Sequence, residues 1–215
     1  MAKRRKVGNL LALTVLASLA ERPMHPYELA SVAKHRGKDK DMKINWGSLY
    51  TVVANLEKHG FIEAAGTDRQ GRRPERTVYQ ITPAGRAELA DWLRELLGNP
   101  QREYLTFRAA LSVAGVLGPD EVRDLLDARL RALGEQIARD ADDLAATARA
   151  IPRIFLIEEE YALAIRRAEA EWVRGLLAEM ADGSLPGLAQ WRRYFETGEL
   201  DPEIAKLAEE GRPTD

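Results

Sequence analysis

The 215-residue sequence contains no cysteine, which excludes disulfide bonds, thiolate metal sites and thiol redox sensing. It has only three histidines, His25, His35 and His59, and their spacing is not that of a zinc site, so we expect no metal and no cofactor. Long apolar runs are also missing. The longest, residues 10–20, is interrupted by two hydroxyl residues and is too short to span a bilayer. No convincing cleavage site follows it, so the sequence predicts a cytoplasmic protein.

Motifs of the common enzyme classes are absent as well. The chain has no glycine-rich phosphate loop and no nucleophile elbow. Glu158, Glu159 and Glu160 are adjacent on an expected helix and point in different directions, so they indicate a solvated face rather than an acid–base pair. We therefore do not expect an enzyme.

Charge is nearly balanced overall, at −2, but it is unevenly distributed along the chain. Residues 1–82 hold 15 Lys and Arg against 8 Asp and Glu, a balance of +7. Residues 83–215 hold 17 against 26, a balance of −9. The length allows one or two domains. A basic front and an acidic back are typical of a DNA-binding domain joined to a separate partner-binding domain.

The stretch from residue 44 to residue 62 contains the central helix of the basic half. Its apolar residues recur at the spacing of one buried helical stripe: Leu49, Val52, Val53 and Leu56. Asn45 is placed to cap the start of this helix, because its side chain can accept an unpaired backbone N–H. Gly60 is expected to end it, because glycine adopts the left-handed conformation at little cost.

The outward face of this central helix suits a DNA major groove. It consists of Ser48, Tyr50, Thr51, Ala54, Asn55 and Lys58. Hydroxyls and lysine can contact phosphates, an amide can pair with adenine, and no carboxylate stands among these six residues. An ordinary amphipathic surface helix is the alternative interpretation.

Two helices are expected before the central one, which together predict a helix-turn-helix arrangement. The first covers residues 10–19 and the second residues 26–34, where Tyr27, Leu29 and Ala30 or Ala33 are expected to be buried. The basic segment before the first helix is interpreted as a flexible arm that could contact DNA. A terminus that only increases solubility is the alternative. It consists of Lys3, Arg4, Arg5 and Lys6.

After the central helix, residues 61–65 and 77–81 are expected to form a β-hairpin with a basic tip. The arginines at this tip are Arg69, Arg72, Arg73 and Arg76. Guanidinium groups bind phosphates bidentately and fit a narrow minor groove, so the tip is a second candidate DNA contact. A solvated hairpin tip is the alternative.

These segments resemble the PadR family of bacterial transcriptional regulators over roughly residues 8–96. The motifs that carry the resemblance are H-P-Y-E-L at residues 25–29, G-S-L-Y at 47–50, L-E-K-H-G at 56–60, R-R-P-E-R at 72–76 and Y-Q-I-T-P-A-G at 79–85. The resemblance implies a winged helix-turn-helix that binds operator DNA as a homodimer. It implies DNA contacts from Tyr27, Ser48, Tyr50, Thr51, Asn55 and the Arg-rich wing. Trp46 departs from the small residue or proline expected there, and we expect it to pack.

The acidic half is predicted to be helical throughout. Thr82 caps a helix that ends near residue 98, which sets the predicted domains at residues 1–97 and 98–215. Residues 104–117 are apolar on most sides and are expected to be buried, and two long helices follow at about 119–150 and 153–180. Their apolar stripes exceed what one antiparallel pair can bury, which favours a homodimer, as in similar PadR-type regulators. The residues expected at the dimer interface are Leu126, Leu130, Leu133, Ile157, Ile165 and Leu176.

Aromatic residues of the acidic half could line an effector cavity between protomers. These are Phe155, Tyr161, Trp172 and Trp191. Core packing is the alternative, and nothing in the sequence identifies a ligand.

The sequence therefore predicts a mainly α fold with a small β-hairpin, made of a winged helix-turn-helix domain and a C-terminal long-helix dimerisation domain. The predicted function is sequence-specific regulation of transcription, as a repressor, by a homodimer bound to palindromic double-stranded operator DNA. Release by a small-molecule effector is part of this prediction. The alternatives are a winged-helix module that binds other proteins and touches DNA weakly or not at all, and a non-enzymatic small-molecule binder.

Overall fold

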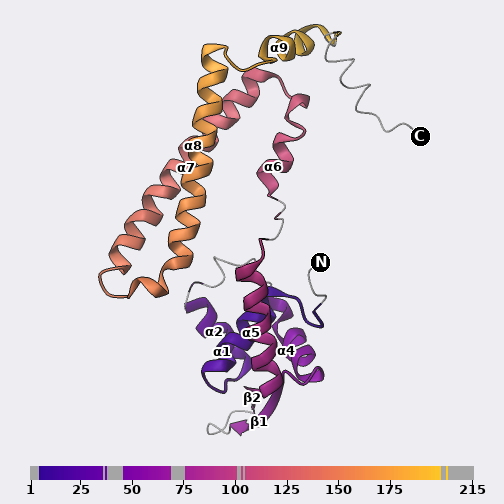
Figure 1. The fold of residues 1–215 in the computed structure, drawn as a ribbon, viewed down its shortest axis with the longest axis vertical. Helices are drawn as coiled ribbons and strands as arrows, with labels where there is room; N and C mark the ends of the chain where they lie inside the picture. Colours follow the sequence, from indigo (N-terminus) through magenta and orange to yellow (C-terminus); the bar gives the residue numbers. More distant parts are fainter. Residues whose placement is uncertain are drawn as a thin grey trace, which may run out of the picture. The chain divides into compact units, whose positions relative to one another are not determined.

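The computed structural model describes residues 5–35, 37, 46–68, 76–100, 103, 105–199 and 202. These residues are mainly helical with one antiparallel two-stranded sheet, as the sequence predicts (Figure 1). The chain divides into two compact units, Met1–Arg102 and Glu103–Asp215. The sequence places the boundary after residue 97, a few residues earlier. Among the described residues, no helix has both the length and the apolar character needed to cross a bilayer.

The first unit contains, in chain order, α1 (Leu10–Glu21), α2 (Pro26–His35), the short 3₁₀ helix η1 (Trp46–Ser48), α4 (Leu49–Lys58), β1 (Ile62–Asp68), β2 (Arg76–Ile81) and α5 (Pro83–Gly98). We call it the winged-helix unit. Asn9 caps α1, because its side-chain oxygen accepts the N–H of Leu11 at 2.8 Å. The expected helix-helix-hairpin order is confirmed, with each strand a little longer than predicted.

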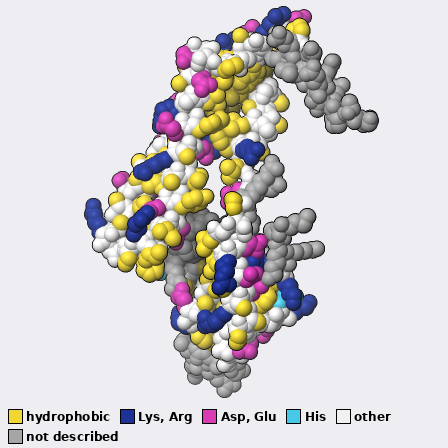
Figure 2. Space-filling model, in the orientation of Figure 1, with side chains coloured by type: hydrophobic (Ala, Val, Ile, Leu, Met, Phe, Trp, Pro, Cys, Tyr) yellow, Lys and Arg dark blue, Asp and Glu magenta, His cyan; other side chains and the backbone are white. Residues whose placement is uncertain are grey.

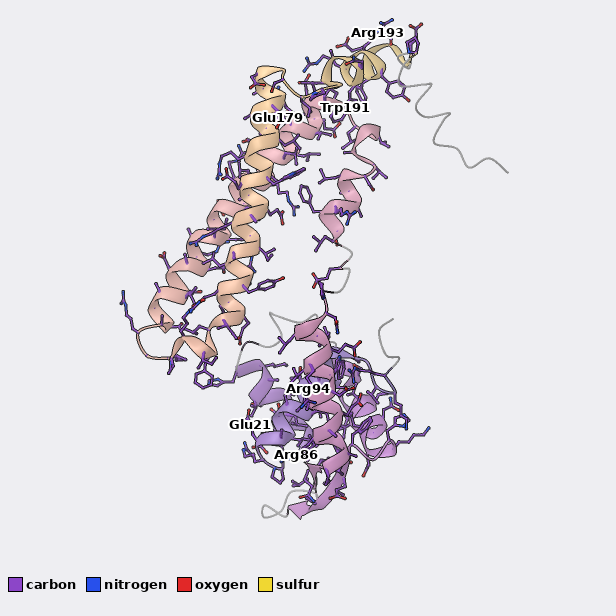
Figure 3. The ribbon with its side chains drawn as sticks, in the orientation of Figure 1. Glu21, Arg86, Arg94, Glu179, Trp191 and Arg193 are labelled. Carbon is purple, nitrogen blue, oxygen red and sulfur yellow. The ribbon has the colours of Figure 1, made fainter. Side chains whose placement is uncertain are left out.

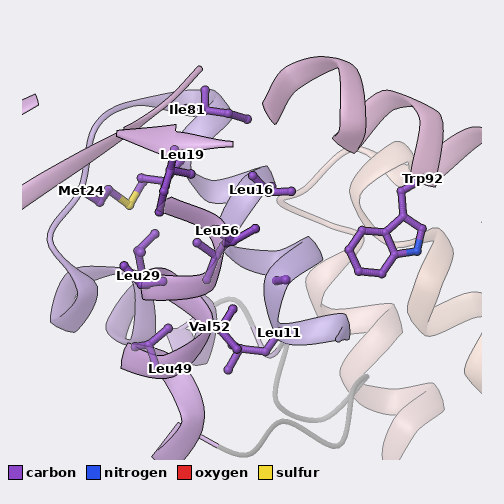
Figure 4. Close-up of a cluster of buried hydrophobic side chains, with 14 residues drawn as sticks. Leu11, Leu16, Leu19, Met24, Leu29, Leu49, Val52, Leu56, Ile81 and Trp92 are labelled. Atoms are coloured by element: carbon purple, nitrogen blue, oxygen red, sulfur yellow. The ribbon is translucent and has the colours of Figure 1, made fainter. Parts of the chain in front are cut away.

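The core of this unit lies where α1, α2, α4 and both strands meet (Figure 4). The four apolar residues of the α4 stripe are all buried, and Leu56 is fully covered. They pack against Leu11, Leu16 and Leu19 of α1. The periodicity of the sequence therefore identifies the correct face of α4. In α2 the prediction is wrong for Tyr27, because its side chain is 70% exposed while Leu29 and Ala33 are buried.

The two ends of α4 differ in how well the sequence predicts them. Gly60 has a φ of +72°, so the expected glycine stop is confirmed. At the other end η1 precedes the helix, and Ser48, not Asn45, occupies the N-cap position without a capping side-chain bond. The predicted cap by Asn45 is therefore wrong in register, and Asn45 itself lies outside the described residues.

The hairpin pairs Ile62 with Ile81 and Ala64 with Tyr79, with a bulge before Gly66. On its other side β2 pairs with the segment between α1 and α2. There the backbone of Tyr79 exchanges two hydrogen bonds of 3.0 Å with that of Met24. The wing is thereby joined on one side of β2 to β1 and on the other side to the segment between α1 and α2.

The second unit contains α6 (Thr106–Leu111), η2 (Ala114–Val116), α7 (Pro119–Thr147), η3 (Arg153–Phe155), α8 (Ile157–Asp182) and α9 (Leu188–Thr197). We call it the helical unit. The long helices α7 and α8 run side by side (Figure 1) and share a core of buried apolar residues. Val122 and Leu126 of α7 pack there with Val173 and Met180 of α8.

The expected burial of residues 104–117 is wrong for the part that the structure describes. Instead of one buried helix, α6 is short and none of its residues is buried. Val113 and Val116 are largely exposed. The apolar composition of this segment predicts that its side chains are buried, but no other described part of the chain packs over them closely enough to bury them.

Candidate nucleic-acid interface

Helix α4 presents a polar, solvent-exposed face opposite its buried stripe. Tyr50, Thr51, Asn55 and Lys58 are all exposed, and Ala54 lies among them. The nearest acidic residue on the helix, Glu57, accepts a hydrogen bond from the Tyr79 phenol of β2. Burial raises the pKa of this phenol above its ordinary value, and the Glu57 carboxylate raises it further, so Tyr79 stays protonated as a donor. Tyr50, Thr51, Asn55 and Lys58 include no carboxylate, so the face that they form suits a polyanion.

The start of α2 lies at the surface of the same unit. The His25 ring accepts the N–H of Tyr27 through Nδ1 at 3.1 Å, which caps the first turn of α2 and leaves the Tyr27 ring exposed. Glu28 is held by Arg22 in an ion pair of 2.5 Å. This arrangement keeps the predicted contact residue Tyr27 accessible.

Most of the predicted wing contacts fall outside the described residues. These are Arg69, Arg72 and Arg73, and the side chain of Arg76 is likewise not described, although Arg76 begins β2. The same holds for Lys3, Arg4, Asn45 and the side chain of Trp46. Lys6 and Ser48 are described, with Lys6 exposed and Ser48 half-buried. The roles of these residues at DNA stay predictions.

The structure corrects the prediction for Arg5. Its side chain is only 5% exposed and bonds to Glu88 at 2.7 Å and Glu95 at 2.5 Å on α5. The guanidinium also lies 5.3 Å from the ring centroid of Trp92. Burial lowers the pKa of Arg5, but the hydrogen bonds to the two carboxylates outweigh it and hold the pKa above its ordinary value. Arg5 therefore fastens the N-terminal segment to α5 and does not belong to a free arm that reaches DNA.

Helices packed against a β-hairpin, with one face of α4 left exposed beside it, define a winged helix-turn-helix, a class of DNA-binding domain. Residues 15–91 match the family model described as the transcriptional regulator PadR-like family. This match covers 77 of the 215 residues, all of them in the winged-helix unit, and shows that this unit is similar to that family.

One curated relative is a probable transcriptional regulator of Mycobacterium tuberculosis, 34% identical over 92 residues. The match covers 41% of this chain and 45% of that protein, so the chain spans less than half the length of this relative. The fold is similar to Bacillus subtilis PadR in complex with operator DNA, with a TM-score of 0.65 and 20% identity over 80% of this chain and 99% of that one. The complex of the same protein with p-coumaric acid gives a TM-score of 0.63 and 19% identity over the same shares. At these identities the likeness shows the fold.

The helical unit separates the predicted dimerisation residues into two groups. Leu126 and Leu133 are buried within the chain, and Leu130 and Leu176 are half-buried against the same intrachain core. The assignment of Leu126 and Leu133 to a dimer interface is corrected, because they are buried within one chain, while the roles of Leu130 and Leu176 stay predictions. Ile157 and Ile165 are instead about half exposed on α8.

Ile157 and Ile165 belong to a longer apolar surface on α8, which we call the α8 stripe. It consists of Ile157, Tyr161, Ile165, Ala168 and Trp172. At about 100° per residue these five positions fall within roughly 80° of the helix circumference. Hydrophobic side chains gather on the face of the helical unit seen in Figure 2. Within the described part of the chain, Phe107 of α6 contacts Trp172, while all five side chains of the α8 stripe remain exposed to solvent.

The four aromatic residues predicted for an effector site do not share one cavity within the chain. Phe155 and Tyr161 are exposed. Trp191 on α9 (Figure 3) donates its ring N–H to the carbonyl of Leu117 at 3.0 Å and packs into the unit's core, so it has a structural role. Only Trp172 lines the cavity described next.

A cavity of about 530 Å³ lies between α6, α7 and α8. Its lining includes Phe107 and Leu111 of α6, Arg129 of α7, and Glu169 and Trp172 of α8. Phe107 meets Trp172 edge to face at a centroid distance of 6.2 Å, and the Arg129 guanidinium stacks 3.7 Å from the Phe107 ring centre. Arg129 Nε also donates to Glu169 at 2.7 Å. Apart from Trp172, sequence reasoning missed this cavity, because its walls come from three helices far apart in the chain.

Proposed function

We propose that this chain is a sequence-specific regulator of transcription, a repressor that acts as a cytoplasmic homodimer on a palindromic operator. Helix α4 lies in the major groove, and the start of α2 and the wing contact the flanking backbone. The observation that carries the proposal is the exposed face of α4, whose hydroxyls, amide and lysine stand opposite a fully buried apolar stripe. Its role in the cell is regulatory and not catalytic.

The α8 stripe is the surface through which we propose that two copies associate. An isologous interface uses the same patch on both copies, and an exposed apolar surface of five neighbouring side chains is such a patch. Two winged-helix units held by one dimer would place their α4 helices in successive major grooves, about 34 Å apart. The operator is accordingly expected to contain two inverted half-sites.

The first experiment is a selection from random duplexes, followed by a gel shift with the selected sequence and with the DNA upstream of the chain's own gene. Strong preference for one inverted repeat supports the proposal. Equal binding to all duplexes in dilute salt contradicts it, because non-specific phosphate contacts alone give no sequence preference.

Asn55→Ala should relax the base preference at one position in each half-site. The exposed amide of Asn55 can make a bidentate pair with adenine, worth about 1–3 kcal/mol against a wrong base. We expect the affinity for a single half-site to fall by roughly tenfold, and that of the homodimer for both half-sites by about a hundredfold, while the affinity for random DNA stays unchanged. Competition gel shifts with single-base operator variants measure this. If the order of preference among the variants survives, Asn55 does not read a base.

The cavity between α6, α7 and α8 is proposed as the effector site. Apolar and aromatic walls with a few polar groups suit a flat, amphipathic molecule, and Arg108 and Arg129 against Glu169 give the lining one excess positive charge. An aromatic carboxylate meets both conditions. The α8 stripe shares Ile165, Ala168 and Trp172 with this lining, so a bound ligand could change the packing of two copies.

Arg129→Met should weaken binding of an aromatic carboxylate by about tenfold, because it removes a charge-assisted hydrogen bond. Glu169→Gln is the matched variant: it leaves Arg129 without its carboxylate partner and should strengthen binding. p-Coumaric acid and anilinonaphthalene sulfonate serve as probes, with quenching of tryptophan fluorescence as the readout and Trp172→Phe as the control for its origin. If Arg129→Met and Glu169→Gln bound the probes with the same affinity, or if the probes did not quench the fluorescence of the wild type, the cavity would not be the effector site.

A further inference from the structure

The first turn of α5 is joined to the end of α4 through one hydroxyl group. After α4, the chain turns at Gly60, and the N–H groups of Gly60 and Phe61 donate back to the carbonyls of Glu57 and Leu56. The carbonyl oxygens of Gly60 and Phe61 lie 2.7 Å and 3.1 Å from Thr82 Oγ1, which donates to this turn. The same Thr82 oxygen accepts the N–H of Gly85 at 3.0 Å, which caps α5.

Close backbone contact reinforces this connection between the turn after α4 and the first turn of α5, which we call the joint. The backbone N–H of Thr82 donates to the Phe61 carbonyl at 3.0 Å. A Cβ at Gly85 would stand 2.0 Å from the same carbonyl oxygen, so only glycine allows α5 to lie this near the turn. The end of α4 and the start of α5 therefore hold a fixed mutual position.

Other contacts bind the same region to the rest of the unit. Arg86, one turn into α5, donates to the carbonyl of Ala20 at the end of α1 at 3.1 Å, and it lies near Glu21 (Figure 3). The Tyr79 phenol donates to Glu57 of α4, one residue from Lys58 of the exposed face. Thus α4 is held from α5 by Thr82 and from β2 by Tyr79.

We infer that Thr82 is a positioning residue of the DNA-binding surface, which makes the orientation of α4 follow that of α5. The chain leaves the winged-helix unit after α5, so the Thr82 contacts are a direct connection between α4 and the element that leads to the helical unit. Thr82 itself contacts no DNA in this scheme. The inference rests on the proposed function, because it concerns how α4 is presented to an operator.

Thr82→Val tests this inference, because valine has the shape of threonine without the hydroxyl, and Thr82→Ser keeps the hydroxyl. We expect Thr82→Val to lower the affinity for the selected duplex by about tenfold while affinity for a random duplex of equal length changes little. Thr82→Ser should restore the ratio of the two affinities to within about threefold of wild type. Binding is measured well below the melting temperature of each variant, which thermal unfolding establishes.

A merely structural cap predicts a different result: a lower melting temperature for Thr82→Val with an unchanged affinity ratio, which would overturn the inference. If Thr82→Val does not fold, Thr82→Ala decides, because it removes the same hydroxyl group and adds no bulk. A reduced ratio in that variant supports the joint, and an unchanged ratio overturns it. Failure of the proposed function would look different, because the wild type itself would then show no preferred duplex.

Discussion

Gly85→Ala should destabilise the winged-helix unit by about 3 kcal/mol, the upper part of the usual range for an added methyl group in a packed site. The added Cβ would lie 2.0 Å from the Phe61 carbonyl oxygen and 2.8 Å from Cγ1 of Ile81. Backbone cannot move aside as a flexible side chain can, so α5 must shift away from the turn after α4. For a domain of this size we expect the melting temperature to fall by roughly 12–24 °C, measured by circular dichroism or calorimetry.

Gly8→Ala in the same unit is the control, because its Cβ would meet only Arg5 Cβ at an ordinary 3.8 Å. We expect no loss of stability there. Binding of Gly85→Ala to the selected duplex, measured on the folded variant, should fall by tenfold or more, because α4 and α5 can no longer keep their native contact. If Gly85→Ala kept the stability and the DNA affinity of the wild type, the turn after α4 would be able to move away from the added Cβ. That result would contradict a fixed contact between α4 and α5.

Local patterns allowed much of the winged-helix unit to be predicted from sequence. The stripe of Leu49, Val52, Val53 and Leu56 follows the period of the helix, and its burial is confirmed. The cap of α5 by Thr82 and the stop at Gly60 also depend on residues close in sequence. Short-range rules suffice wherever the partner lies within one or two helical turns.

Long-range partners explain where prediction from sequence was wrong. Arg5 reads as part of a free basic arm, because its partners Glu88 and Glu95 are more than 80 residues away. Tyr27 reads as buried from helical spacing alone, but the packing of α2 leaves it exposed. Composition and period give no information about contacts of this kind.

The helical unit shows the same limit for its apolar surfaces. Leu126 and Ile165 both belong to apolar stripes of long helices, and the sequence does not tell which stripe faces the neighbouring helix and which faces outward. In the structure Leu126 is buried between α7 and α8, whereas Ile165 is about half exposed. The exposed surface is then the one available to a second copy, so we keep Ile157 and Ile165 of α8 in the proposed interface and remove Leu126 and Leu133 of α7.

Ile165→Glu should split the proposed homodimer and thereby abolish tight operator binding. Two glutamates would face each other across an isologous apolar interface, where unpaired charges cannot be solvated. Sedimentation equilibrium is expected to show the 24.0 kDa chain as a monomer. Affinity for a duplex with two half-sites should drop on the order of 10²–10⁴-fold, because the second winged-helix unit is no longer tethered, while affinity for a single half-site stays unchanged.

Ala178→Glu is the matched control on the same helix. Ala178 is exposed, receives the same charge, and lies about 100° around α8 from the centre of the α8 stripe. It should leave both the dimer and operator binding intact. A dimer that survives Ile165→Glu, or one that is lost equally in Ala178→Glu, would place the interface elsewhere. Loss of the dimer in Ile165→Glu but not in Ala178→Glu would show that the apolar side chains exposed on α8 form the dimer interface. That interface would then be what holds two winged-helix units together on an operator with two inverted half-sites.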